Sequence, residues 1–152
     1  MSAARLALDT NVLVYAVDTT EEARCARAQD IVRRAAESER CMLAFQSIGE
    51  FYAAVTRKGI QAPAEAARQA RDWMVLFPTI DPIAADALGA LDAAASGRFS
   101  YWDALLLTTL GRAGCMALLS EDMHDGAVLA GVTVHDPFQG EALPAAVAAL
   151  LD

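Results

Sequence analysis

The sequence has few of the residues that typically form zinc sites, disulfides or basic surfaces. It contains three scattered cysteines, none in CxxC spacing, and only two histidines. An odd number of scattered cysteines is typical of reduced thiols, so we expect a cytoplasmic protein with neither a disulfide framework nor a zinc centre. The net charge of −8 argues against tight, nonspecific binding of nucleic acid through a basic surface.

Lysine and long apolar runs are also scarce. A phospho-accepting receiver domain needs a lysine at the end of a late strand. Lys58 is the only lysine and closes a predicted helix, so the sequence argues against a receiver domain. No stretch approaches the roughly 18 consecutive apolar residues of a membrane span. The N-terminal apolar run is interrupted by Asp9 and has no cleavage signature, so we expect no signal peptide. Without repeats or linkers, residues 1–152 are expected to form a single domain that does not associate with membranes.

Apolar runs of strand length alternate with segments of helical composition along the chain. We predict strands at 6–8, 41–45, 76–80, 115–119 and 132–134. We predict helices from about residue 12 and at 21–38, 47–58, 63–74, 82–95, 100–114 and 144–151. This alternation predicts an α/β domain with a mainly parallel central sheet.

Four acidic residues lie at the ends of predicted strands or the starts of predicted helices. Asp9 follows the first strand and Asp122 follows the strand at 115–119. Glu50 and Asp103 are each placed in the first turn of a helix. Because ligands of parallel α/β sheets bind beyond the carboxyl ends of the strands, we expect all four side chains to project toward one edge.

A simpler interpretation of each acid is local hydrogen bonding at a helix start. Ser47-x-x-Glu50 and Ser100-x-x-Asp103 both resemble capping boxes, and Asp9 could cap the first helix alone. Asp103 fits this interpretation least, because at 100° per residue it falls within the apolar face of its own helix. An acid on that face is either buried with a partner or lines a cleft.

Four carboxylates at one edge would repel one another and raise one another's pKa values. A divalent cation would remove this repulsion. Ligands that are all oxygen, without a histidine or cysteine pair, favour Mg²⁺ or Mn²⁺ over Zn²⁺. The sequence therefore predicts a magnesium-type site capable of hydrolysis.

Several motifs resemble the PIN domain, and more closely the VapC-type ribonuclease toxins of bacterial toxin–antitoxin pairs. They are "LDTNVLVYA", "SIGEFYAAVTRK", "FSYWDALLL", "LLSEDMHDG" and "GVTVHDPF", in the order and approximate spacing of that family. The resemblance implies a three-layer α/β/α sandwich in which Asp9, Glu50, Asp103 and Asp122 bind Mg²⁺. It also implies supporting roles for three polar residues, which are Thr10, Asn11 and Ser120. "HDPF" departs from the Asn-Pro-Phe of relatives, so Asp136 is a further candidate, as is Asp125.

The expected function is a Mg²⁺-dependent endoribonuclease that cleaves phosphodiester bonds by metal-activated water. The resemblance implies RNA as substrate, an antitoxin protein as partner and a homodimer. Candidate phosphate contacts are Arg57, Lys58, Arg98 and Arg112. Two alternatives remain open, a PIN-type nuclease acting on other RNA or DNA outside a toxin–antitoxin system, and a degenerate PIN-like domain that only binds.

Overall fold

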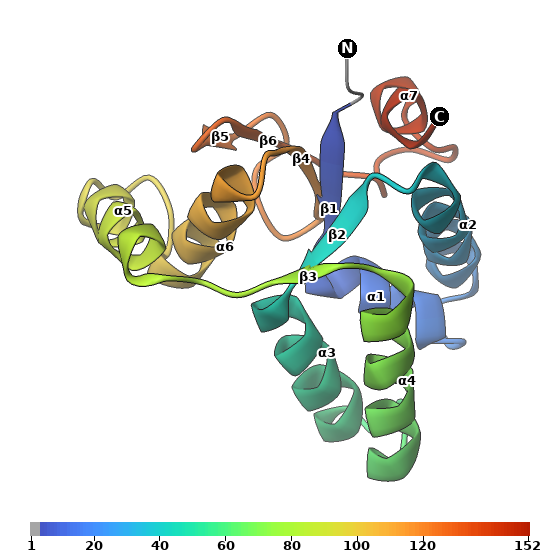
Figure 1. The fold of residues 1–152 in the computed structure, drawn as a ribbon. Helices are drawn as coiled ribbons and strands as arrows, with labels where there is room; N and C mark the ends of the chain where they lie inside the picture. The colour runs from blue at the N-terminus through green and yellow to red at the C-terminus, as the bar shows by residue number, and fades with distance from the viewer. Residues whose placement is uncertain (1–3) are drawn as a thin grey trace.

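The structure, a computed structural model, describes residues 4–152 and consists of a central sheet between two layers of helices (Figure 1). In this part of the chain the six strands are β1 (Arg5–Leu8), β2 (Cys41–Ala44), β3 (Thr79–Ile80), β4 (Cys115–Leu119), β5 (Val128–Leu129) and β6 (Val132–His135). The seven helices are α1 (Thr10–Val17), α2 (Glu22–Ser38), α3 (Phe45–Arg57), α4 (Pro63–Leu76), α5 (Ala84–Ala95), α6 (Tyr101–Arg112) and α7 (Ala145–Leu151). The predicted α/β/α architecture is confirmed.

The sheet is parallel except at one edge. Its strand order is β3-β2-β1-β4-β6-β5, and only β5 runs antiparallel to its neighbour. Strand β1 is central and pairs with β2 and β4, with Leu8 opposite Leu119. The carboxyl ends of β1, β2 and β4 therefore lie at the same edge of the sheet.

Alternating side chains of the central strand enter two different cores. Leu6 and Leu8 pack with α1, α2, α3, α4 and α7 on one face. Ala7 faces the opposite side and packs with leucines of α6. Helices α5 and α6 pack against each other in a smaller third cluster. This period-two alternation explains why Leu6, Ala7 and Leu8 are all buried, although they face opposite sides of the sheet, whereas Arg5 at the start of the strand is exposed.

Several predicted boundaries differ from the structure. The strand predicted at 76–80 is wrong at its start, because Leu76 ends α4 and only Thr79–Ile80 pair with β2. Pro78 separates the two elements, and a proline can neither continue a helix nor donate to a ladder. The helix predicted from residue 82 begins at Ala84, where the Asp86 carboxylate accepts a hydrogen bond from the Ile83 N–H. Helix α1 begins at Thr10, two residues earlier than predicted.

Strand β5 is absent from the sequence prediction. It forms a hairpin with β6 through Ala130 and Gly131, which both have positive φ angles of 53° and 79°. Two consecutive residues with positive φ are typical of a tight hairpin turn. Because alanine rarely adopts this conformation, Ala130 gives no turn signal in the sequence. The remaining strands and the C-terminal helix lie where they were predicted, within one or two residues.

Candidate metal centre at the sheet edge

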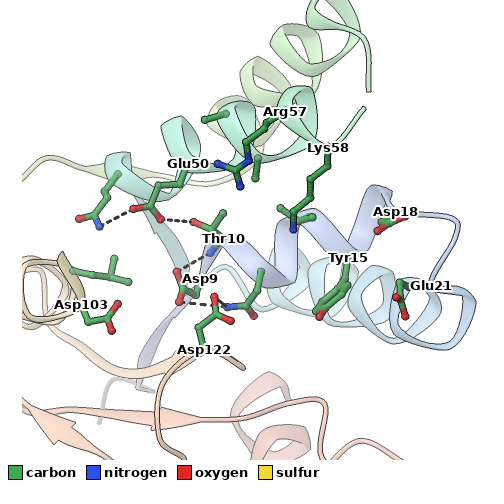
Figure 2. A pocket seen from close by; sticks show the side chains of 16 residues that line it. Asp9, Thr10, Tyr15, Asp18, Glu21, Glu50, Arg57, Lys58, Asp103 and Asp122 are labelled. Carbon is green, nitrogen blue, oxygen red and sulfur yellow. Dashed lines mark hydrogen bonds between the residues drawn. The ribbon is translucent and has the colours of Figure 1, made fainter. Parts of the chain in front are cut away.

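All four predicted acids line one pocket of about 520 Å³ at the carboxyl edge of the sheet (Figure 2). Asp9 comes from the end of β1 and Glu50 from α3. Asp103 comes from the first turn of α6, and Asp122 from the loop after β4. Four segments that are distant in the sequence therefore supply one carboxylate each to the same space.

Asp9 is the most enclosed of the four, with only 5% of its surface exposed. Its Oδ1 accepts a hydrogen bond of 2.7 Å from the Thr10 N–H, which caps helix α1. Its Oδ2 accepts a hydrogen bond of 2.7 Å from the hydroxyl of buried Ser120. Asp9 is therefore both a helix cap and part of the pocket wall.

Asn11 connects Asp9 to Asp122. Its amide Nδ2 lies 3.4 Å from Asp9 Oδ2 and 3.2 Å from Asp122 Oδ2, and its Oδ1 accepts a hydrogen bond from the Glu121 N–H. The Asp122 N–H in turn donates to the Ser120 hydroxyl. The loop after β4 is thereby tied to the first turn of α1.

Glu50 is held by side chains and not by a capping box. Its Oε2 accepts a hydrogen bond of 3.0 Å from the Thr10 hydroxyl, and its Oε1 accepts one of 3.0 Å from Gln46 Nε2. The capping-box interpretation of Ser47 and Glu50 is wrong, because α3 begins at Phe45 and Ser47 is buried inside the helix. Glu50 consequently lies in the second turn of α3, not in the first.

At Asp103 the capping interpretation holds for Ser100 but not for the Asp103 carboxylate. The Ser100 hydroxyl accepts a hydrogen bond of 3.1 Å from the Asp103 N–H and caps α6. The Asp103 carboxylate is half-buried and faces the pocket (Figure 2), which Leu106 of the same helix also lines. This position agrees with the apolar helix face on which the sequence places it.

The pocket disfavours negative charge on two of the acids. The pKa of Asp9 is raised to about 6, chiefly by burial and additionally by the charges of Asp122 and Glu50, although hydrogen bonds from Ser120 and Thr10 lower it. The pKa of Asp103 is also raised, mainly by burial and additionally by Asp122 and Glu50, while Ser100 lowers it. An added cation would favour the charged form of every one of these groups.

The donor set fits a hydrated magnesium or manganese ion. Within residues 4–152, no three acidic, histidine or cysteine side chains converge closely enough to form a complete protein cage for a metal. Mg²⁺ does not require such a cage, because it keeps several of its waters and takes only one or two carboxylates directly. Such an ion would reduce the repulsion between the carboxylates that line the pocket. It would also lower the raised pKa values of Asp9 and Asp103.

The four residues predicted to contact phosphate lie at three different places in the structure. Arg57 and Lys58, at the end of α3, line the acidic pocket (Figure 2). Arg98 lines a neighbouring pocket. Arg112 lines neither, because its guanidinium is bound to buried Asp86 at 3.0 Å and to the Asp81 carbonyl. Arg112 thus holds α5 against α6 and is not placed to contact a substrate at the acids.

Asp125 and Asp136 take part in turns. Asp125 Oδ1 accepts a hydrogen bond of 2.8 Å from the Asp136 N–H, and Asp136 Oδ1 accepts one of 2.9 Å from the Phe138 N–H. Neither lines the acidic pocket. Their local hydrogen bonds account for both residues without a metal.

Two features of the site have no clear signal in the sequence. Gln46 orients Glu50, but a glutamine one turn before a glutamate is common in helices. Arg24 on α2 forms an ion pair with Glu121 and donates a hydrogen bond of 2.6 Å to the Tyr15 hydroxyl. Its guanidinium also lies 5.0 Å from the centroid of the Tyr15 ring. The ion pair between Arg24 and Glu121 joins residues 97 positions apart, and neither composition nor periodicity reveals such a pairing.

Comparisons with known proteins agree with this architecture. A family model described as the PIN domain matches residues 6–124, a range that includes all four acids and more than half of the chain. No curated protein sequence matches the chain significantly. A solved structure, that of VapBC2 from Rickettsia felis bound to a DNA fragment from its promoter, contains a similar chain. The match has a TM-score of 0.58 at 11% identity and covers 86% of this chain and 96% of that one, so it concerns the fold. Within residues 4–152, no helix is both long and apolar enough to cross a membrane.

Proposed function

This chain belongs to the PIN domain family, and from that premise we propose that it is a Mg²⁺-dependent endoribonuclease of the VapC type. PIN domains are generally nucleases, and the matched range contains the whole acidic pocket. The single observation that carries the proposal is the convergence of Asp9, Glu50, Asp103 and Asp122 on one pocket from four segments. A non-catalytic PIN-like domain would have no need to keep all four acids facing the same space.

The residues around the acids have separable tasks in this proposal. Asp9, Glu50, Asp103 and Asp122 would hold Mg²⁺, or Mn²⁺ in its place, directly or through water. The bound ion would supply polarisation of the scissile phosphate and would lower the pKa of water. Ser120 and Asn11 fix the orientation of Asp9 and Asp122, and Thr10 fixes Glu50.

Arg57 and Lys58 give the pocket a cationic side. Both extend from the end of α3 and line the pocket beyond Glu50 (Figure 2). A phosphate that enters an acidic pocket is repelled by the carboxylates, so positive groups in the pocket wall favour binding of a nucleic-acid backbone. Two basic side chains in the pocket wall, on a chain of net charge −8, suit local contact with a few phosphates.

The biological setting that we propose is that of a toxin restrained by an antitoxin. The VapBC2 structure contains a chain of the same fold and holds VapBC2 bound to promoter DNA. By analogy, this chain would act in the cytoplasm, form a homodimer and bind a cognate antitoxin protein. Its exposed apolar side chains, which include Val75 at 89% and Leu88 at 66% exposure, provide surface for such contacts.

Cleavage assays on the purified, partner-free protein test the proposal. We expect single-stranded RNA to be cut internally with Mg²⁺ or Mn²⁺, and cutting to stop when EDTA is added. Asp103→Asn should abolish cleavage, while Asp92→Asn, an exposed acid of α5, should leave it unchanged. Parallel assays with single-stranded DNA separate a ribonuclease from a nuclease of other specificity. Cleavage that survives EDTA would refute the metal-dependent mechanism.

A further inference from the structure

A second pocket adjoins the acidic pocket at two of its acids. Its volume is about 490 Å³, and Asp103 and Asp122 line it as well as the first pocket. The two acids therefore form the boundary between two hollows. Arg57 and Lys58 lie in the first hollow, whereas Arg98 lies in the second.

An endonuclease needs space on both sides of the bond that it cuts. A phosphodiester within a strand carries one nucleoside on each side, so a phosphate held at the acids extends a nucleotide into each hollow. This step rests on the proposed function, because only an internal cut of a strand requires both hollows. The second pocket is placed to receive the nucleotide that points away from α3.

The chemistry of the second pocket suits a nucleobase better than a phosphate. Apolar side chains contribute to its lining, namely Phe99, Met123, Ala127 and Val128. Polar groups that could meet the edge of a base come from Ser100 and His124. A nucleobase has an apolar face and a polar edge, so this combination matches it.

Arg98 is held in an orientation that offers a flat surface. Its Nη2 donates a hydrogen bond of 3.2 Å to the Val128 carbonyl, and its guanidinium carbon lies 5.6 Å from the centroid of the Phe99 ring. The residue as a whole is exposed. Bases stack on guanidinium planes as they do on aromatic rings, and a plane that is already fixed loses little entropy on binding.

We infer that the second pocket binds the nucleobase next to the scissile phosphate and that Arg98 is the surface on which this base stacks. Arg98 is then a substrate-positioning and specificity residue, separate from the carboxylates that hold the metal. Stacking of this kind requires the planar guanidinium of Arg98, whereas simple charge attraction would require only its positive charge.

Abasic RNA tests this inference directly. The probe is a short RNA that the wild-type protein cuts once, prepared as a series in which one base at a time is removed. Removal of one base beside the cut should lower kcat/KM by about tenfold, a typical effect of one stacked base. In Arg98→Ala the intact RNA should be cut about tenfold less efficiently, chiefly through KM. The penalty for removing that base should then largely disappear.

Two variants separate a stacked base from a phosphate contact. Arg98→Lys keeps the charge without the plane, and we expect it to behave like Arg98→Ala. Arg71→Ala, an exposed arginine of α4 that lines neither pocket, removes the same charge and should behave like wild type. If Arg98→Lys restores normal cleavage, Arg98 contacts phosphate and the inference is wrong.

A second readout requires neither turnover during the measurement nor a variant that folds. Photo-crosslinking of the wild-type protein in EDTA, with 4-thiouridine at the position identified by the abasic series, should label residues 98–100 or 123–128. Labelling elsewhere would overturn the inference while leaving the proposed nuclease activity intact. Absence of any RNA cleavage by wild type would instead refute the proposed function, and the inference with it.

Discussion

Arg24 on α2 forms an ion pair with Glu121, the residue between Ser120 and Asp122. The other carboxylate oxygen, Glu121 Oε2, is buried and accepts no hydrogen bond from residues 4–152. The loop that contributes Asp122 to the pocket is thus fastened to a helix on one face of the sheet. Arg24 does not line the pocket, so it affects the site indirectly, through this loop and through Tyr15, which lines the pocket and accepts a hydrogen bond from Arg24.

We therefore predict that Arg24→Ala weakens metal binding without removing a ligand. Loss of a hydrogen-bond partner of a metal ligand typically costs 10- to 100-fold in metal affinity, and because Arg24 contacts the neighbour of Asp122 and not Asp122 itself, we expect the lower end of that range. The Mn²⁺ dissociation constant, measured by calorimetry, should rise by about tenfold. Arg33→Ala is the matched control, since Arg33 lies on the same helix but pairs with exposed Asp30 and Glu37. Equal effects of the two substitutions would contradict a positioning role for Arg24.

Asp9→Asn should separate a metal ligand from a helix cap. Asparagine caps helices about as well as aspartate, so a residue that only caps should tolerate the change. Without metal, removal of one crowded charge should leave the melting temperature level or higher. Wild type should gain roughly 2.7 kcal/mol at a Mg²⁺ concentration 100 times its dissociation constant, and the variant should lose most of this gain. Thermal melts with Mg²⁺ and with EDTA measure both effects.

The expected pattern for Asp103→Asn is the same, because Asp103 shares the raised pKa and the same neighbours. Retention of both RNA cleavage and metal-induced stabilisation by Asp9→Asn would show that the acidic edge is not the active site.

The metal-free protein should lose stability as the pH rises from about 4 to about 6. Asp9 has a raised pKa of about 6 in the folded state against 3.8 as its ordinary value, so the folded state binds more protons in this interval. Stability then falls with rising pH, by up to about 3 kcal/mol for this group, since each pKa unit corresponds to about 1.4 kcal/mol. Urea unfolding in EDTA at several pH values measures the trend. Asp9→Asn should show a much weaker fall, and saturating Mn²⁺ should oppose the fall in wild type.

Ser120→Ala should be costly because its hydroxyl serves the buried network. The hydroxyl donates to Asp9 and accepts from the Asp122 N–H. Leaving such groups unpaired costs about 1–3 kcal/mol, which chemical unfolding should detect. Thr109→Val is the matched control, because the Thr109 hydroxyl is also buried but has no hydrogen-bond partner within residues 4–152. That substitution should be neutral or stabilising, and a similar loss in both variants would argue against a special role for Ser120.

We also predict that the protein self-associates. Helices α4 and α5 expose large apolar side chains, among them Val75 and Leu88, and burial of this surface against a second copy would favour association. Sedimentation velocity at tens of micromolar should show a dimer. Val75→Glu and Leu88→Glu are tested separately. The substitution that yields a monomer identifies the helix that lies in the interface. A wild-type protein that is monomeric at this concentration would contradict the prediction.

The sequence predicts much of the fold and the acidic site because both depend on local patterns. Alternation of strands and helices places Asp9 and Asp122 after parallel strands, and parallel strands end at one edge. The apolar face of α6 correctly places Asp103 against the core side of its helix. These inferences require only periodicity and the geometry of a parallel sheet.

What the sequence does not predict depends on tertiary contacts. Ser47 resembles a cap but is buried because α3 continues directly from β2 without a turn. Arg112 resembles a surface cation, yet it neutralises Asp86, whose burial follows from the packing of α5 on α6. Arg24 reaches Glu121 only after α2 has packed beside the sheet. Each case is a long-range pairing that leaves no periodic trace.

The central position of β1 has a consequence for the timing of activity during synthesis. Asp9 is made early, but its buried place requires β4 and the hydroxyl of Ser120, which lies 111 residues later. A chain still on the ribosome before that point has one open side to β1 and lacks Asp122 altogether. At about 5–20 residues per second, several seconds of translation separate the first acid from the last. The proposed nuclease would therefore have its complete set of acids only after most of its chain has been synthesised.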